Sequence, residues 1–188
     1  MPPKVKVTRE QILDAAMTIL REKGVNALNA RAVAKRIGSS TQPIFSNYAD
    51  MNALHADVMR EAYAVFSGML TAETESGRYP PYKASGMAYI RFAREEPMLF
   101  RAFFMRNRTE KEQEQDGDAF TQYANGAVQA GIAEDDAVSF HLNMWIFVHG
   151  IASLIATGYL QLSEEEASRR VTDAYLGLKM KIYGESNG

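Results

Sequence analysis

The chain has 188 residues, 46% of them hydrophobic, and a formal net charge of −2 at pH 7. This length suits one large domain or a small domain joined to a larger one, and it allows a substantial buried core. The absence of cysteine excludes disulfides, thiolate zinc sites and cysteine nucleophiles. The most apolar run, Met144 to Ala156, is shorter than the roughly 18 residues that span a bilayer, and no signal-peptide stretch follows the N-terminus. We therefore expect a cytoplasmic protein without a membrane partner.

Charge is distributed unevenly along the chain. Residues 1–50 hold eight Lys or Arg and four Asp or Glu, a local net charge of +4, so the remainder carries −6. The net charge of the whole chain, taken alone, argues against a nucleic-acid binder. A positive segment followed by an acidic one is instead typical of a small DNA-reading domain joined to a separate regulatory domain.

Helix signals dominate the sequence and strand signals are almost absent, which predicts an all-α fold of about nine helices. The first helix begins near Thr8, which forms a capping box with Gln11 because the hydroxyl accepts a backbone N–H and the amide reaches back. The apolar residues that follow repeat at helical spacing: Ile12, Ala15, Ala16, Ile19 and Leu20. Gly24 can adopt the backbone conformation that ends this helix.

Two short helices are expected next, followed by a long one. The first short helix covers about 30–37, with Asn29 as its N-cap, and the second covers about 41–48. Gly38 permits the tight turn between them. Asp50 can cap a long fourth helix.

The segment 77–81, rich in Gly and Pro, is the clearest break in the sequence. Five more helices are predicted after it, at about 81–95, 97–106, 117–130, 134–157 and 163–183. Asn107 to Asp118 is polar and charged, so we expect a loop there. Ser163 and Glu166 form a second capping box at the start of the last helix.

Residues 29–48 have the pattern of a helix-turn-helix. The apolar residues of the two short helices can face a common core: Val33, Ala34, Ile37, Ile44, Phe45 and Tyr48. The second helix then exposes short hydrogen-bonding side chains: Ser40, Thr41, Gln42, Ser46 and Asn47. Such groups contact phosphates and base edges, and glutamine can bond bidentately to adenine. We therefore expect this helix to read double-stranded DNA.

Residues 8–54 resemble the DNA-binding domain of the TetR repressor family. The family's signature positions are matched by Thr8, Ile12, Ala15, Ala16, Gly24, Val33, Ala34, Gly38, Ser40, Ile44, Tyr48 and Leu54. Phe45 departs from the pattern, since the family usually has a phosphate-contacting tyrosine there, and Met51 stands where a lysine is frequent. The resemblance implies a helix-turn-helix head of three helices, 1–50, and a ligand-binding and dimerisation domain, 51–188.

The helix-turn-helix and this resemblance together give a set of expected DNA contacts: Lys6, Asn29, Ser40, Thr41, Gln42, Pro43, Phe45, Ser46, Asn47 and Tyr48. Lys4 and Lys6 belong either to an arm that follows the DNA or to a solvated tail. A dimer of such heads implies a pseudo-palindromic operator, with one recognition helix in each of two major-groove half-sites.

The C-terminal half resembles the TetR ligand-binding class that is named for its Trp-His-Gly elements. Trp145, His149 and Gly150 carry this resemblance. The expected ligand contacts are Met87, Phe100, Phe103, Phe104, Tyr123, Trp145 and His149. The Met and Phe residues either pack the core or line a pocket, and the same two interpretations stay open for Trp145 and His149. A small hydrophobic effector is expected, aromatic or cationic-aromatic, with Trp145 stacking on it and His149 making one hydrogen bond.

The resemblance also implies a homodimer through a four-helix bundle made by the last two helices and their copies. The residues expected in that interface are Gly150, Ser153, Ala156, Val171, Ala174, Tyr175 and Leu178. Small residues on one side of the first of these helices would allow its copy to approach closely.

Signals for catalysis are weak. The sequence has no phosphate loop, dinucleotide-binding glycine pattern or serine elbow. His141 and His149 would lie roughly 12 Å apart on one helix, too far to share a metal ion. We therefore expect no enzyme activity, cofactor or metal, and a ligand-responsive transcription factor that represses by default, with activation left open. The alternative is a helical dimeric enzyme or small-molecule carrier with a vestigial head.

Overall fold

The computed structural model describes residues 7–184, apart from the side chains of residues 111, 112, 114–119 and 122. Within that part of the chain all regular structure is helical, which confirms the predicted all-α fold of nine α-helices. The helices are α1 Arg9–Lys23, α2 Ala30–Arg36, α3 Gln42–Asn47, α4 Met51–Glu75, α5 Pro81–Glu95, α6 Pro97–Phe104, α7 Glu110–Gln129, α8 Glu134–Ala156 and α9 Glu164–Gly184, with a 3-10 turn, Val25–Ala27, after α1.

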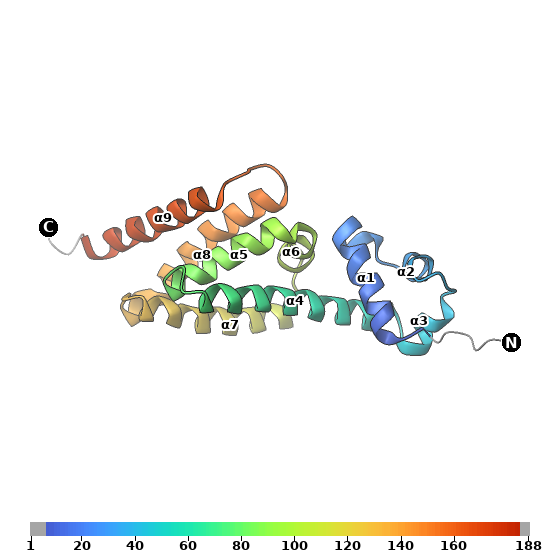
Figure 1. Ribbon diagram of the computed structural model, residues 1–188. Helices are drawn as coiled ribbons and strands as arrows, with labels where there is room; N and C mark the ends of the chain where they lie inside the picture. The colour runs from blue at the N-terminus through green and yellow to red at the C-terminus, as the bar shows by residue number, and fades with distance from the viewer. Residues whose placement is uncertain (1–6, 185–188) are drawn as a thin grey trace.

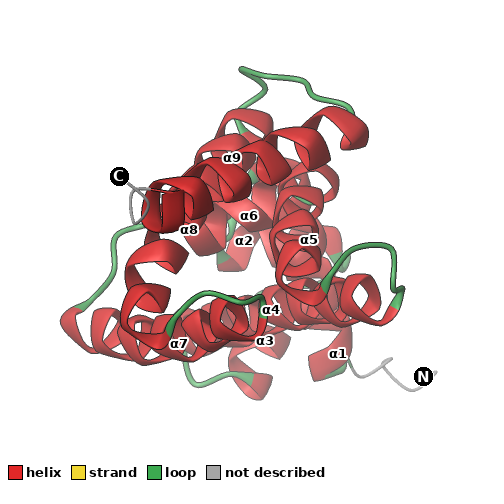
Figure 2. Ribbon diagram, turned by 90° about the vertical axis from the view of Figure 1, so that its left-hand side faces the viewer, coloured by secondary structure: helices red, strands yellow, loops and turns green. Residues whose placement is uncertain are grey.

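The molecule is elongated, with α1, α2 and α3 forming a head at one end (Figure 1). Helix α4 leaves the head and runs along the body, and α5 packs between α4 and α8. Figure 2 looks along this axis from the end opposite the head, with α9 lying over α8 and α5. The chain therefore passes from the head into the body through α4, and α1 of the head also packs on α6 of the body.

The predicted helix starts are confirmed by their caps. Thr8 Oγ1 accepts from the Gln11 N–H at 3.2 Å while Gln11 Oε1 accepts from the Thr8 N–H at 3.0 Å, which completes the capping box. Asn29 and Asp50 accept the backbone N–H three residues ahead, at 3.0 and 2.8 Å. The second capping box, of Ser163 and Glu166, also has both of its hydrogen bonds. Each cap satisfies an N–H that a helix start leaves unpaired.

The expected loop at 107–118 is wrong for most of its length, because α7 already begins at Glu110. The carbonyl of Thr109 accepts from the N–H of Gln113 at 2.9 Å, which closes the first turn. This segment is rich in Glu, Gln and Lys, which are good helix formers. Its polarity was therefore not a sign of an irregular backbone.

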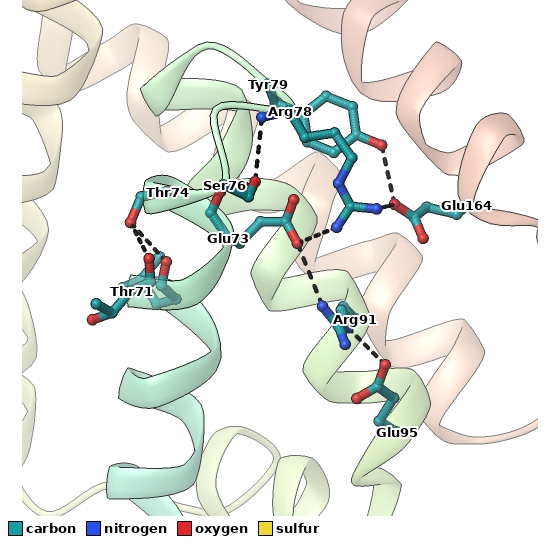
Figure 3. Close-up of polar contacts among 10 residues, drawn as sticks. Thr71, Glu73, Thr74, Ser76, Arg78, Tyr79, Arg91, Glu95 and Glu164 are labelled. Atoms are coloured by element: carbon teal, nitrogen blue, oxygen red, sulfur yellow. Dashed lines mark hydrogen bonds and ion pairs between the residues drawn. The ribbon is translucent and has the colours of Figure 1, made fainter.

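Helix α4 is about 37 Å long at 1.5 Å per residue, and it carries the two charged side chains that are buried among the described residues, Asp57 and Glu73. Glu73 lies near the end far from the head, where its carboxylate pairs with Arg78 at 2.8 Å and with Arg91 at 3.6 Å (Figure 3). Arg78 also pairs with Glu164 at 2.6 Å. These contacts fasten the far end of α4 to α5 and to the start of α9.

Helix α8 is the one helix of the described chain that is long and apolar enough to cross a membrane, with 23 residues and a mean hydropathy of 1.4. A single helix of this kind is weak evidence for a membrane span, because the core helix of a globular protein passes the same test. Here α8 packs against α5, α6, α7 and α9. Only 28% of its apolar window is buried within the protomer, so much of its surface is open to a further contact.

Candidate DNA-binding surface and effector site

The head is held together by a small apolar core. Ile12 and Leu20 of α1, Val33 of α2, Ile44 of α3 and Leu54 of α4 are fully buried. At Gly38, between α2 and α3, φ is +65°, as the tight turn requires. The recognition helix α3 is therefore fixed to the rest of the head through Ile44 and the turn before it.

Helix α3 presents a mixed polar and aromatic surface to solvent. Gln42, Ser46 and Phe45 are exposed, as is Ser40 just before the helix, while Thr41 and Pro43 are half-buried. Phe45 has 50% of its surface exposed, so it does not belong to the apolar side that packs the core. These positions agree with the location expected for DNA contacts on the outer face of α3.

Three expected DNA contacts lie elsewhere or are engaged within the head. Tyr48 is only 3% exposed, so its ring belongs to the core of the head and cannot reach a base edge, a correction to the expected set. The Asn47 amide already donates to the Pro43 carbonyl at 2.8 Å and to the Val7 carbonyl at 3.4 Å. Asn29 is exposed but its side chain caps α2. Lys6, like Lys4, lies outside the described residues.

An ion pair around the buried carboxylate of Asp57, which the sequence patterns did not reveal, joins α1 and the end of α3 to α4. Asp57 accepts from Arg9 at 2.6 and 3.1 Å and pairs with Arg60, while the Arg9 guanidinium lies 4.5 Å above the centre of the Tyr48 ring. Hydrogen bonding from Arg9 is the main reason that the pKa of Asp57 lies below its ordinary value, with Arg60 adding to it. The Asp57–Arg60 spacing of three residues along one helix was the one signal in the sequence.

The second candidate site is a cluster of rings contributed by α4, α5, α6, α7 and α8. At its centre the Nδ1 atom of His149 lies 2.8 Å from the Tyr89 hydroxyl. Trp145 stacks on His149 with 5.0 Å between ring centres and an interplanar angle of 20°. Phe104 packs against Tyr89 at 4.7 Å, and Phe103 stacks on Tyr63 of α4 at 5.6 Å. Trp145 and His149 thus share one face of α8, as their spacing predicted.

The same arrangement recurs two turns earlier on α8. The Nδ1 atom of His141 lies 3.0 Å from the Tyr82 hydroxyl of α5, and Phe120 of α7 packs on the imidazole at 4.7 Å. Tyr123 lies parallel to the His141 ring at 6.3 Å. Burial lowers the pKa of both His141 and His149, so both rings are neutral near pH 7.

Exposure divides the expected ligand contacts into buried residues and residues that a ligand can reach at least in part. Met87 and Phe100 are buried within the body, so they are core residues and not surface that a ligand can reach in this conformation. Trp145 is 40% exposed, and Tyr123 is exposed as well, although both contact the ring cluster. Phe103, Phe104 and His149 are half-buried. Trp145 is therefore not a closed core residue, and the reachable set also includes Tyr63, which the sequence patterns did not single out.

Some residues expected in the dimer interface are buried inside the protomer. Ala156 and Val171 are almost inaccessible, and Tyr175 packs on Phe140 at 5.3 Å while its hydroxyl donates to the Ala130 carbonyl at 2.9 Å. Ala156 and Val171 are therefore corrections, because the chain itself covers them, whereas Tyr175 is half-buried and only partly engaged within the chain. Ser153, Ala174 and Leu178 are half-buried.

The outer face of α8 and α9 is nevertheless strongly apolar. Its exposed members are Leu142, Ile146, Leu154, Leu176, Met180 and Tyr183, of which Ile146 is 56% and Met180 72% exposed. A side chain at Gly150 would meet no atom within 4 Å, so this glycine lies open on the same helix. A surface hollow of about 490 Å³, lined by Leu176, Lys179 and Met180 among others, continues the face toward the end of α9. We call this surface the α8–α9 face.

The chain is similar to known regulators over nearly its whole length. A curated relative, an uncharacterized HTH-type transcriptional regulator, YobS, of Bacillus subtilis (strain 168), is 22% identical over 167 residues, 88% of this chain and 87% of that protein. A solved TetR-like transcriptional regulator from Rhodococcus sp. RHA1 superposes with a TM-score of 0.67 at 17% identity, over 95% of this chain and 98% of that one. The multidrug binding protein EbrR, solved in complex with imidazole, gives a TM-score of 0.59 at 16% identity, over 88% of each chain.

The family model of the tetracyclin repressor-like C-terminal domain matches residues 82–175, which is half of the chain. That segment runs from the start of α5 into α9 and so contains the members of the ring cluster on α5, α6, α7 and α8, but not Tyr63 of α4. The solved structures share the all-helical architecture described above, with the helix-turn-helix head in front of the body. Regulators of this kind bind DNA and small effectors and are not enzymes. The chain therefore belongs to the TetR family of transcriptional regulators, with a C-terminal ligand-binding domain.

Proposed function

We propose that the protein is a homodimeric repressor that binds a pseudo-palindromic operator and is released from it by a small hydrophobic effector. The observation that carries the DNA-binding part is the surface of α3, where Gln42, Phe45 and Ser46 are exposed while Ile44 anchors the helix from below. Gln42 and Ser46 offer hydrogen bonds to base edges and phosphates. Phe45 supplies apolar contact, such as with a thymine methyl group.

The effector site we propose is the half-exposed part of the ring cluster, formed by Tyr63, Phe103, Tyr123, Trp145 and His149. Ligand sites are mainly apolar, with a few polar groups that orient the guest, and this cluster has that composition. EbrR, whose fold is similar, is described as a multidrug binding protein, which supports a role of the same kind for this body.

The dimer we propose forms through the α8–α9 face. A monomer rarely exposes so continuous an apolar surface, and a copy related by two-fold symmetry would cover it. The pairing would bury the open apolar side of α8, where Gly150 leaves room for close approach. The functional division we propose places DNA binding in 1–50 and regulation in 51–188, with α4 beginning at Met51, directly after the DNA-binding part.

Release from DNA would follow from a shift between two separations of the heads. Helix α6 links the ring cluster to the head, since Phe104 lies in the ring cluster and Glu96, just before the helix, accepts from Arg21 of α1 at 3.0 and 3.1 Å. A Cβ added at Gly24 would lie 2.8 Å from the Met98 terminal carbon, so α1 and α6 are in close contact. An effector that displaces α6 would therefore displace the head.

The deciding experiment is selection of binding sites from genomic DNA, followed by measurement of affinity at several salt concentrations. A repressor of this kind enriches pseudo-palindromic duplexes and loses affinity steeply as salt rises, because phosphate contacts release counterions. An enzyme or carrier with a vestigial head would enrich no sequence and show no salt-dependent binding. The position of enriched sites relative to promoters then distinguishes repression from activation.

A further inference from the structure

The hydrogen-bonding state of His149 can be worked out from its surroundings. Burial raises the pKa of the Tyr89 phenol, so this hydroxyl keeps its proton and must place it on an acceptor. Among the described residues, its hydrogen-bond partner is Nδ1 of His149, at 2.8 Å. A neutral imidazole carries one N–H, and if Nδ1 accepts from the phenol, that hydrogen is on Nε2.

The opposite tautomer is disfavoured. If Nδ1–H donated to Tyr89, the hydroxyl hydrogen of a nearly fully buried tyrosine would have no acceptor, which costs about 1–3 kcal/mol. No hydrogen bond from the described residues reaches Nε2 of His149. The ring that stacks on Trp145 therefore offers a donor that has no partner among the described residues.

The charges around the cluster favour an uncharged ligand. No Asp or Glu among the described side chains bonds to Tyr63, Tyr89, Trp145 or His149. Among the described side chains, a charged group beside the cluster is Arg108, whose guanidinium lies 5.8 Å from the centre of the Phe103 ring and whose Nη1 donates to the Phe103 carbonyl at 2.7 Å. A cationic ligand would find no carboxylate among the described side chains of the cluster to offset its desolvation.

We propose that the effector is a flat, uncharged aromatic molecule bearing a hydrogen-bond acceptor, such as a ring carbonyl, which accepts from Nε2–H of His149 while its rings contact Trp145. This narrows the aromatic or cationic-aromatic class expected from sequence to the acceptor-bearing, uncharged part of it. The inference rests on the proposed effector site. The test below distinguishes failure of that site from failure of the hydrogen bond assigned to His149.

Three tricyclic probes of similar size differ in the relevant property. Xanthone has a ring carbonyl, xanthene lacks it, and the N-methylacridinium ion carries a positive charge instead. Each is titrated into the full-length protein and followed by tryptophan emission, which reports on one position because Trp145 is the sole tryptophan. We expect xanthone to bind about fivefold to tenfold more tightly than xanthene, the contribution of one good hydrogen bond, and the cation to bind more weakly than xanthone.

The variant His149→Phe keeps a flat ring under Trp145 but removes the donor. It should abolish the advantage of xanthone over xanthene while leaving the affinity for xanthene little changed. The matched control is His141→Phe, which removes an imidazole with the same kind of tyrosine partner outside the Trp145 stack, and it should preserve the advantage. Tyr89→Phe frees Nδ1 to carry the hydrogen, so it should reduce the advantage without removing it.

The outcomes are distinguishable. If none of the three probes changes Trp145 emission, the effector site itself is wrong. If xanthone and xanthene bind equally, or the cation binds best, the ring cluster remains the site but the donor assigned to His149 is overturned. Loss of the advantage in His141→Phe and its retention in His149→Phe would overturn the assignment as well. Far-UV circular dichroism of each variant establishes that it is folded.

Discussion

Gln42 is the residue of α3 whose exposed side chain can make two hydrogen bonds to a single base. Replacing it with alanine should weaken binding to the selected operator by about 1–3 kcal/mol and relax base preference at the position it contacts. The measurement is a competition titration against operators substituted at single base pairs. An unchanged preference would remove Gln42 from base readout.

The matched control for Gln42 is Lys35→Ala, in the last turn of α2, where the side chain is exposed. A lysine that contacts only phosphate carries no sequence information, so this variant should weaken binding to all duplexes alike. It should also make the slope of log affinity against log salt concentration shallower by about one, because one fewer counterion is released on binding. The two variants together separate reading of bases from gripping of the backbone.

Asp57 makes the stability of the head depend on pH. The pKa of Asp57 is lower in the folded protein than in the unfolded chain, chiefly because of Arg9. The ionised carboxylate therefore stabilises the fold at any pH above the unfolded pKa of about 4. This contribution is lost as the pH falls through the lower pKa of the folded state. Asp57→Asn should therefore reduce the free energy of unfolding at neutral pH by about 1.5–3 kcal/mol, the worth of hydrogen bonds to a charged group. Urea unfolding from about pH 7 down to pH 3 should show the two proteins converging in acid.

The control for Asp57 is Glu61→Gln, which removes a carboxylate from the exposed side of the same helix. No ion pair with another described residue is lost there, so the unfolding free energy should change by less than about 0.5 kcal/mol. A loss as large as that of Asp57→Asn would mean that the net charge of α4, and not the contact with Arg9, determines the effect.

At the scale of elements, helix starts in the head depend on single side chains. Asn29 holds the first turn of α2 through one hydrogen bond to the Ala32 N–H. Asn29→Ala should cost about 0.5–2 kcal/mol of stability, because that N–H is left without its protein partner. Asn52→Ala, an exposed site within α4, is the comparison and should be neutral or slightly stabilising, since alanine is the better helix former. Thermal unfolding of both variants measures the difference.

At the scale of the whole molecule, the α8–α9 face should decide the oligomeric state. Ile146→Glu places a carboxylate at the centre of this exposed apolar surface, where pairing with a copy would bury an unpaired charge. We expect a folded monomer by sedimentation, with operator affinity lost because two half-sites are no longer bound together. Dimers of unchanged stability in this variant would exclude the α8–α9 face.

The comparison for Ile146 is Ala64→Glu, the same charge placed on an exposed position of α4. It should leave the dimer intact, because α4 is not part of the α8–α9 face. A monomer from this variant would instead indicate that added negative charge weakens association in general.

The sequence by itself determined the local features of this protein. The caps at Thr8, Asn29 and Asp50 are set by side chains within three residues of the atoms they bond, so they can be read without the fold. The same holds for the turn at Gly38 and for the shared helical face of Trp145 and His149. The helix-turn-helix was predictable because its spacing and polarity are local too.

Contacts between distant segments were decided only by the tertiary structure. Arg9 and Asp57 are 48 residues apart, and Tyr89 and His149 are 60 apart, so no periodicity relates them. The interface prediction failed at Ala156 and Val171 for a related reason, since a stripe of small or apolar residues does not reveal which side of a helix its own chain covers. Helical spacing determines which residues share a face, but packing of the whole chain determines what that face meets.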